Sequence, residues 1–345
     1  MRHKSQLSRR AFLGTTAGLA AAATFATPAI VQAQAPIAFR VSSSMPVDPN
    51  AAHYIWFEEF QKRLKAKVGD RIRLDYFPNG QLGKEADVVQ QVIIGSVDMM
   101  ITGSSIWATA VPEIGMLDLG FLFDDYVHGA KALDAGLGDA LANLMMDRKG
   151  VGVLGWGFHF GARSVYTRTK AADLNGLKSV KLRVLPAPAF IETFKLMGAV
   201  PTPMPINELY TGLQTGVVDG FEHDAATVLS NRFYEVTKFC LQTDHLFSPM
   251  TASVGKRGLA KVPNDLKDAF HTAAREATIA ERAVADSKAK EAIKELEKLG
   301  VSFTPFPAAD RKAIGKQMSD KLYAQFAEQY PATKPLFEII AKARA

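Results

Sequence analysis

Residues 207–221, NELYTGLQTGVVDGF, connect a helix to a strand through a single glycine. The helical spacing runs over 207–215, Gly216 stands where a left-handed cap residue is wanted, and 217–221 has the composition of a buried strand. Residues 95–98, GSVD, repeat this step after an amphipathic segment over 84–94. The repeat indicates two α/β units of like construction, with coincidence as the alternative because the pattern is common in α/β folds.

Strand-like and helix-like segments alternate on both sides of these two steps. The predicted strands are 37–41, 71–77, 97–101, 180–184 and 217–221, and the predicted helices are 51–68, 84–94, 187–197 and 207–215. Strand, helix and strand in this order predict βαβ units, and therefore sheets that are at least partly parallel.

The segment 263–299 is unusually long for one helix. Its apolar residues keep a helical phase, and no Gly or Pro follows Pro263 until Gly300. At 1.5 Å per residue it would measure about 54 Å, so we expect it to run along both units. Two helices with a break near Lys288 are the alternative. The last segment, 308–345, is expected to form helices broken by Pro331 and Pro335.

The N-terminus has the features of a targeting leader. Arg9 and Arg10 precede a weakly apolar, Ala-rich stretch, which ends in small residues around Ala33. The arginine pair resembles a twin-arginine (Tat) signal, so we expect residues 1–33 to be removed during export to the periplasm. No second stretch is long and apolar enough to span a membrane, so the mature chain is not expected to be membrane-spanning.

Charge and cysteine content exclude several classes of function. Four of the 41 basic side chains lie in the leader, which leaves 37 against 35 acidic ones and removes the electrostatic basis for nucleic-acid binding. Cys240 is the only cysteine and is expected to be a small buried hydrophobe, so neither a disulfide nor a Cys-based zinc site is expected. No recognisable nucleophile, metal or phosphate-binding motif is present, and we therefore expect neither an enzyme nor a cofactor.

Two arginines interrupt apolar surroundings. Arg183 lies within VKLRVL (180–185), and Arg163 follows FGA and precedes SVY. An arginine near the end of a strand either lies at the surface or lines a cleft, where its planar group can hold a carboxylate by two parallel N–H bonds. Periodicity alone favours the surface for each of them.

Several motifs together carry a family resemblance. They are GQLGKE (80–85), GAR (161–163), DLNGLKSVKLRV (173–184), MGAVPTPMP (197–205) and ELYTGLQTGVVDG (208–220). In this order they resemble TRAP-transporter solute-binding proteins of the DctP-like, dicarboxylate-binding type, over nearly the whole mature chain. The resemblance implies an α/β, two-lobed periplasmic binding protein fold, with mixed sheets, hinge strands and a long helix spanning both lobes. Lobe I is expected over 36–159 plus about 249–285, and lobe II over 160–248 plus about 286–345.

The same resemblance implies a function. The protein would capture a small organic acid in the cleft between its lobes and deliver it to the membrane permease subunits of a TRAP transporter. A periplasmic component that presents the ligand to a membrane receptor is the alternative. Arg183 falls at the family's carboxylate anchor and Arg163 at a second pocket arginine. The further expected ligand contacts are His223, Glu85, Ser43, Ser104, His159 and Ile206.

The sequence departs from the family pattern at His223. Many acid-binding relatives carry Gln-Glu-Asn where this chain has Phe221, Glu222 and His223. We expect His223 to contact the ligand. Its protonation would strengthen the binding of an anionic oxygen, but would weaken binding if the neutral ring accepts a hydrogen bond from a ligand hydroxyl. A structural histidine paired to Asp224 or Glu222 is the alternative. Relatives that bind 2-oxo acids through a metal tend to have Glu-Trp near this point, so a bridging metal is the less expected arrangement.

Overall fold

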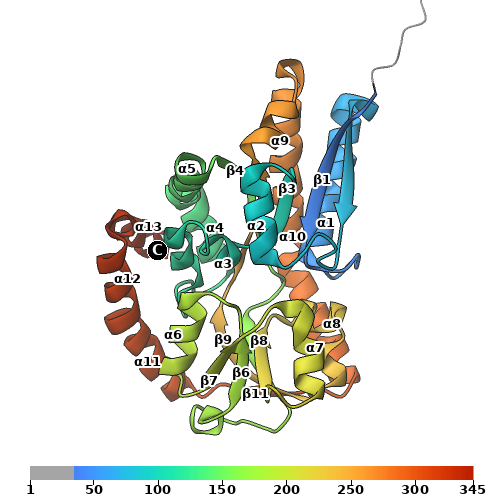
Figure 1. Ribbon diagram of the computed structural model, residues 1–345. Coiled ribbons are helices and arrows are strands. Elements are labelled where there is room, and N and C mark those ends of the chain that lie inside the picture. Colours follow the sequence, from blue (N-terminus) through green and yellow to red (C-terminus); the bar gives the residue numbers. More distant parts are fainter. Residues whose placement is uncertain (1–34, 345) are drawn as a thin grey trace, which may run out of the picture. The chain divides into compact units, whose positions relative to one another are not determined.

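The computed structural model describes residues 35–344, and the predicted leader over 1–33 lies outside them. The strands within 36–345 form two mixed sheets (Figure 1). The first has the order β2-β1-β3-β10-β4, with β1 (Ile37–Ser43), β2 (Ile72–Phe77), β3 (Met99–Gly103), β4 (Val151–Phe158) and β10 (Pro249–Gly255). The second has the order β11-β9-β5-β8-β6-β7, with β5 (Arg163–Thr167), β6 (Lys181–Val184), β7 (Val200–Pro203), β8 (Gly220–His223), β9 (Phe239–Leu246) and β11 (Ser302–Pro305).

Two short connections pass between the sheets. Residues 159–162 lead from β4 to β5, and residues 247–248 return from β9 to β10. Each sheet combines parallel pairs, such as β1 with β2 or β6 with β8, and antiparallel pairs, such as β10 with β3 or β5 with β9. The α/β fold with mixed sheets is therefore confirmed, whereas the exact lobe boundaries stay a prediction.

Helices flank both sheets. They are α1 (Ala52–Val68), α2 (Glu85–Ile94), α3 (Ser104–Trp107), α4 (Tyr126–Ala132), α5 (Gly138–Lys149), α6 (Pro188–Leu196), α7 (Ile206–Gln214), α8 (Ala225–Ser230), α9 (Lys256–Lys261), α10 (Lys267–Lys298), α11 (Ala308–Gln317), α12 (Ala324–Gln329) and α13 (Lys334–Ala343). Among the described residues, no helix is both long and apolar enough to cross a membrane.

The two helix–glycine–strand steps have the same construction. Gly95 and Gly216 adopt φ angles of 79° and 75°, as expected for left-handed caps. The carboxylate of Asp98 accepts a hydrogen bond from the N–H of Arg40 at 2.9 Å, and that of Asp219 accepts one from the N–H of Lys181 at 3.0 Å. In each case the aspartate before the strand accepts a hydrogen bond from the backbone of a neighbouring strand, which supports the prediction of two similar units.

Both strands begin later than predicted. β3 starts at Met99 and not at position 97, and β8 starts at Gly220 and not at position 217. The reason is that the intervening N–H groups complete the helix caps, as Val97 does with the carbonyl of Gln91 and Val218 with that of Gly212. Only after these bonds are made is the backbone free to pair with another strand.

α10 is one continuous helix of 32 residues, about 48 Å long. It passes through Lys288 without a break, so the two-helix alternative is wrong. It packs on α1 and β4 of the first sheet and on α8, which follows β8 of the second sheet. Figure 1 shows it extending alongside both groups of strands, as the sequence predicted.

Glycines on β4 let α10 approach the sheet closely. A Cβ at Gly155 would overlap Thr278 Oγ1, and Thr278 is held in place because it accepts a hydrogen bond from Trp56 Nε1 at 2.9 Å. We therefore expect Gly155→Ala to destabilise the protein by about 1–3 kcal/mol, the usual cost of overpacking. Gly315→Ala in α11 is the matched control, because no atom lies within 4 Å of the added methyl group. Denaturant unfolding of both variants measures the effect, and equal stabilities would contradict the close packing.

The C-terminal helices correct one expectation. A short turn at Pro331–Thr333 separates α12 from α13, so the predicted break at Pro331 is confirmed. The predicted break at Pro335 is wrong, because Pro335 lies in the first turn of α13, where the missing N–H is not needed. α13 then packs on α4, where the ring Nε2 of His128 lies 2.8 Å from the carbonyl of Ile340.

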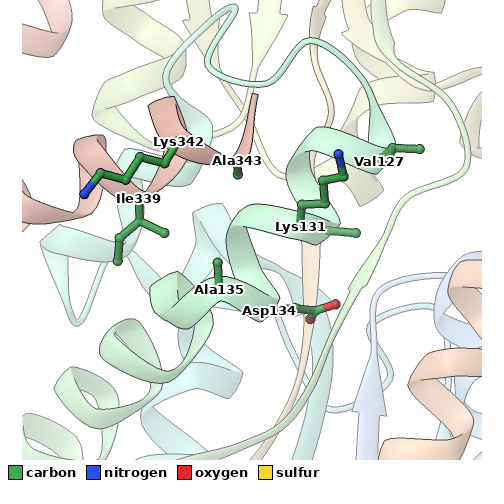
Figure 2. A pocket seen from close by; sticks show the side chains of 8 residues that line it. Val127, Lys131, Asp134, Ala135, Ile339, Lys342 and Ala343 are labelled. Carbon is green, nitrogen blue, oxygen red and sulfur yellow. The ribbon is translucent and has the colours of Figure 1, made fainter. Parts of the chain in front are cut away.

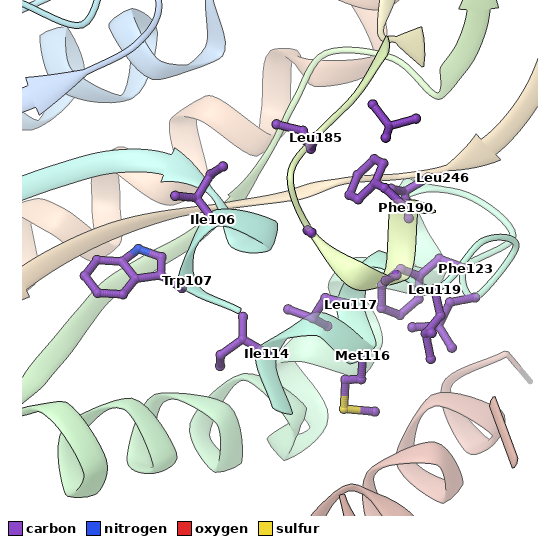
Figure 3. Close-up of a cluster of buried hydrophobic side chains, with 14 of the residues drawn as sticks. Ile106, Trp107, Ile114, Met116, Leu117, Leu119, Phe123, Leu185, Phe190 and Leu246 are labelled. Atoms are coloured by element: carbon purple, nitrogen blue, oxygen red, sulfur yellow. The ribbon is translucent and has the colours of Figure 1, made fainter. Parts of the chain in front are cut away.

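An apolar core joins the segment 106–123 to the second sheet. Figure 3 shows Leu117 and Leu119 in the same buried cluster as Phe190 of α6 and Leu246 of β9. Cys240 is 1% exposed and belongs to a second core cluster, so it is a buried hydrophobe as predicted. Burial raises the pKa of its thiol well above the usual value, which leaves it unreactive.

Candidate functional site

Polar side chains from both sheets meet where β6 and β8 end. The second sheet and the residue after it contribute Arg163, Arg183, Glu222, His223 and Asp224, the first sheet and its helices contribute Ser43, His53 and Ser104, and the connection 159–162 contributes His159. None of them exposes more than 4% of its surface. Because buried charges normally have partners, the hydrogen bonds of each group show what it is able to bind.

Arg183 is the group with the most unused bonding capacity. Its Nε donates to the carbonyl of Met204 at 2.8 Å, but Nη1 and Nη2 have no hydrogen-bond partner among the residues that the structure describes. The side chain is 0% exposed, and burial lowers its pKa to about 10. The expectation of a surface position for Arg183 is therefore wrong. Its two free nitrogens have the geometry that a carboxylate needs for a bidentate bond.

Arg163 is buried too, but it already has an anion. Its Nε and Nη2 donate to the two carboxylate oxygens of Glu222 at 2.6 and 2.7 Å. Burial alone would raise the pKa of Glu222, but Arg163 outweighs that effect and holds it at about 2. Only Nη1 of Arg163 points elsewhere, lying 3.5 Å from both ring nitrogens of His223. Arg163 is not at the surface, but it has far less capacity for a ligand than Arg183.

Three imidazoles form a row beside the arginines. The ring of His159 lies between those of His53 and His223, with centroid distances of 5.1 and 5.8 Å. His223 Nδ1 lies 2.7 Å from Asp224 Oδ2, which is the pairing that the structural alternative anticipated. Burial lowers the pKa of all three rings below the usual histidine value, and Arg163 adds to this at His223. The rings are therefore neutral near pH 7, and a protonated His223 is disfavoured.

The first sheet supplies hydroxyl and carboxylate groups. Glu85 Oε1 accepts hydrogen bonds from Ser44 at 2.8 Å and from Thr102 at 2.6 Å. Ser43 Oγ accepts from the N–H of Met45 at 3.0 Å and lies 2.9 Å from His53 Nδ1. These bonds occupy Oε1 of Glu85 and leave its Oε2 able to accept a hydrogen bond from a ligand, whereas Ser43 Oγ already has two partners.

The remaining two predicted contacts lie on either side of this group. Ser104 Oγ lies 3.3 Å from Asp118 Oδ1 at the start of α3. Ile206 begins α7 and, together with Glu85, lines a small hollow of about 100 Å³ between the first turns of α2 and α7. Lys84 and Glu208 form an ion pair of 2.7 Å between the same two helix ends. The predicted residues thus come together, although Ile206 lies with Glu85 and apart from the imidazole row.

Sequence reasoning missed three members of the cluster. His53, Asp118 and His245 are each no more than 1% exposed, and His245 Nε2 lies 3.4 Å from Glu222 Oε2. Burial raises the pKa of Asp118 well above its usual value, although Arg163 opposes this. No local pattern marks these residues, because each depends on contacts between distant segments. One signal was available for His53: it lies at helical spacing from Phe57 and Phe60, on the apolar face of the helix predicted over 51–68.

Tyr126 links the cluster to both connections between the sheets. Its hydroxyl donates to the carbonyl of His159 at 2.9 Å and accepts from the N–H of Gly161, and its ring packs edge-to-face on Phe158 and Phe247. Gly161 has a φ of 117°, which favours glycine, so the backbone here has a special conformation.

Tyr126→Phe keeps the ring and removes both hydrogen bonds. Each of these hydrogen bonds contributes about 0.5–1.5 kcal/mol. We expect faster ligand dissociation in this variant, because His159 and the connection at 159–162 lose the hydrogen bonds that hold them. Stopped-flow measurement with an organic acid that binds the wild type is the assay. Tyr210→Phe, at the surface of α7, is the control. Unchanged dissociation in Tyr126→Phe would contradict this role.

The structure also has hollows outside this cluster. The one in Figure 2 lies between α4 and α13 and is lined by Val127, Lys131 and Ile339, among others. It contains none of the predicted site residues. Within 35–344, no group of three or more His, Cys, Asp or Glu side chains is placed to hold a metal ion.

The two sheets, the double crossover and the buried arginine define the class of periplasmic binding proteins. The model of the family described as bacterial extracellular solute-binding protein, family 7 (DctP), matches residues 44–329. The chain belongs to this family. The 2,3-diketo-L-gulonate-binding periplasmic protein YiaO of Escherichia coli is 31% identical over 294 residues, which cover 84% of this chain and 87% of that protein.

Solved structures agree in fold. A TRAP periplasmic solute-binding protein from Xanthobacter autotrophicus, with bound β-D-galacturonate, has a TM-score of 0.80 and 27% identity, and the match covers 88% of this chain and 99% of that one. The sugar acid binding protein DctPAm from Advenella mimigardefordensis, in complex with galactonate, has a TM-score of 0.84 and 25% identity, with 89% and 99% covered. The predicted family is confirmed: the protein is a solute-binding component of the TRAP type, and the receptor-presenting alternative finds no support.

Proposed function

We propose that the protein binds a sugar acid in the periplasm and delivers it to the membrane permease of a TRAP transporter. The observation that carries this proposal is Arg183, whose guanidinium is fully buried and has two nitrogens without a partner among the described residues. A charge in such a place costs several kcal/mol unless an anion joins it. A ligand carboxylate supplies that anion, and the planar pair of N–H groups fixes its direction.

The surroundings of Arg183 favour one carboxylate over two. Arg163, the other candidate anchor, is neutralised by Glu222, and the nearby rings of His159 and His223 are neutral because burial lowers their pKa. A second carboxylate would therefore be desolvated without a free cation to receive it. Neutral imidazoles and hydroxyl groups suit the hydroxyls of a sugar acid, which agrees with the galacturonate and galactonate named for the similar structures.

The other predicted residues receive supporting roles in this proposal. Glu85, oriented by Ser44 and Thr102, is placed to accept hydrogen bonds from ligand hydroxyls, and Ser104 offers one hydroxyl of its own. Ligand entry requires the lobes to separate, with the connections 159–162 and 247–248 and the helix α10 as the hinge elements. The relatives are periplasmic proteins, and we propose export through the twin-arginine leader for this chain.

Identification of the bound ligand tests this proposal. Native mass spectrometry of the protein purified from its host should show a bound organic acid that is lost on denaturation. Thermal-shift screening of uronates, aldonates, C4 dicarboxylates and neutral sugars then ranks the classes. We expect a sugar acid to stabilise the protein most, and stabilisation by neutral sugars alone would contradict the proposal.

A further inference from the structure

His53 has one ring nitrogen without a partner. It lies on α1, is 0% exposed, and has its Nδ1 2.9 Å from Ser43 Oγ. Its Nε2 makes no hydrogen bond to any residue in the described part of the chain. The ring lies beside that of His159, which in turn lies beside that of His223 at the end of β8. This buried nitrogen belongs to the same cluster of polar side chains as Arg183, but it comes from α1.

The contacts of Ser43 favour one of the two neutral tautomers of His53. Ser43 Oγ already accepts a hydrogen bond from the N–H of Met45 at 3.0 Å, so its own proton is available to donate. His53 Nδ1 lies at 2.9 Å, where it can accept that proton. The ring is neutral, because burial lowers the pKa of His53 to about 3 in spite of the nearby Asp224. A neutral ring that accepts at Nδ1 carries its single hydrogen on Nε2.

We infer that His53 is a fixed hydrogen-bond donor that selects an oxygen of the ligand other than the carboxylate held by Arg183. This inference rests on the proposed function, since it assigns a second contact within the same site. The expected target is a hydroxyl oxygen of the sugar acid. Ser43 acts as a positioning residue, because it holds the ring and its tautomer without needing to touch the ligand.

The other end of the row is already engaged within the chain. His223 Nδ1 lies 2.7 Å from the carboxylate of Asp224 and 3.1 Å from its N–H, and His223 Nε2 lies 3.5 Å from Arg163 Nη1. A ligand hydroxyl can accept a hydrogen bond from His53 Nε2, whereas a methylene group cannot. This contact therefore distinguishes a hydroxyl from a deoxy position.

The first test measures the tautomer directly. ¹⁵N-histidine-labelled full-length protein, studied without ligand by long-range ¹H–¹⁵N correlation, should show His53 protonated on Nε2, with assignment by comparison to His53→Gln. Ser43→Ala should shift that ring toward a mixture of tautomers, an effect that a purely structural serine would not produce. A proton on Nδ1 in the wild type would overturn the inference.

The second test measures binding of D-galacturonate, D-glucuronate and D-galactonate by calorimetry. His53→Phe should lower the affinity for any of these acids that binds the wild type by about tenfold or more, because a buried ligand oxygen is left without its hydrogen bond. His53→Gln, whose amide can donate from nearly the same point, should bind within a few-fold of the wild type. His271→Phe on the exposed face of α10 is the matched control.

The outcomes separate the two claims. If a sugar acid binds the wild type and His53→Phe equally well, the inference fails and the proposed function stands. If none of the three acids binds the wild type, the proposed function fails for this class, and the tautomer measurement still decides the state of His53. Loss of binding in His53→Gln as severe as in His53→Phe would also contradict a donor role.

Discussion

Arg183→Ala is expected to weaken sugar-acid binding by ~2–5 kcal/mol, the range for truncating one partner of a buried charged pair. The guanidinium is 0% exposed, and two of its nitrogens have no partner in the described structure. The bound carboxylate would therefore lose its charge partner and both hydrogen bonds at once. Calorimetric titration of the acid that ranks first in the thermal-shift screen measures this loss.

Two further variants separate charge from geometry. Arg183→Lys keeps the charge but not the planar fork, so we expect it to be markedly impaired as well. Arg168→Ala removes an exposed arginine just beyond β5 and should bind like the wild type. If Arg183→Ala folds and keeps its affinity, Arg183 is not the anchor.

Glu222→Leu is expected to lower the free energy of unfolding by ~3–5 kcal/mol, because it leaves Arg163 buried without its anion. The two side chains are 0% and 1% exposed and share two hydrogen bonds of 2.6 and 2.7 Å. Removing both charges together, in Arg163→Met/Glu222→Leu, should cost much less than the sum of the single variants. Chemical denaturation measures all three.

The pH dependence of this pair has a definite sign. The pKa of Glu222 is about 2 in the folded protein and 4.5 in an unperturbed chain, so the unfolded state binds more protons between these values. The contribution of the pair to the free energy of unfolding is fully present above pH 4.5 and decreases as the pH falls toward 2. Glu235→Gln, which breaks an exposed pair with Arg232, should change stability little. If the loss of unfolding free energy in Arg163→Met/Glu222→Leu equals the sum of the losses in the two single variants, the two side chains are not coupled.

Local patterns in the sequence were sufficient for the helices α1, α2, α6, α7 and α10. Gly95 and Gly216 identified two helix ends, and the uninterrupted phase over 263–299 indicated the long helix. The onsets of β3 and β8 were predicted too early, because the N–H groups of Val97 and Val218 are used in the caps of the preceding helices. Pro335 was misjudged because the effect of a proline depends on its position within the helix turn.

Only part of the site could be predicted from the sequence. Motifs resembling a family singled out both arginines, whereas periodicity alone placed them at the surface. Nothing in the order of residues shows that Glu222 neutralises Arg163 while Arg183 stays without an anion, since that depends on which side chains meet at the ends of β5, β6 and β8. His53 was missed for the same reason: it reaches the cluster only through the packing of α1 on the first sheet.

The central claim is that a carboxylate is required for binding at Arg183. Calorimetric titration of matched pairs tests it most directly: D-galacturonate with D-galactose, D-glucuronate with D-glucose, and D-galactonate with galactitol. We expect that at least one acid binds and that its neutral counterpart does not bind measurably. Equal affinity for an acid and its neutral counterpart, or binding of a neutral sugar alone, would contradict it.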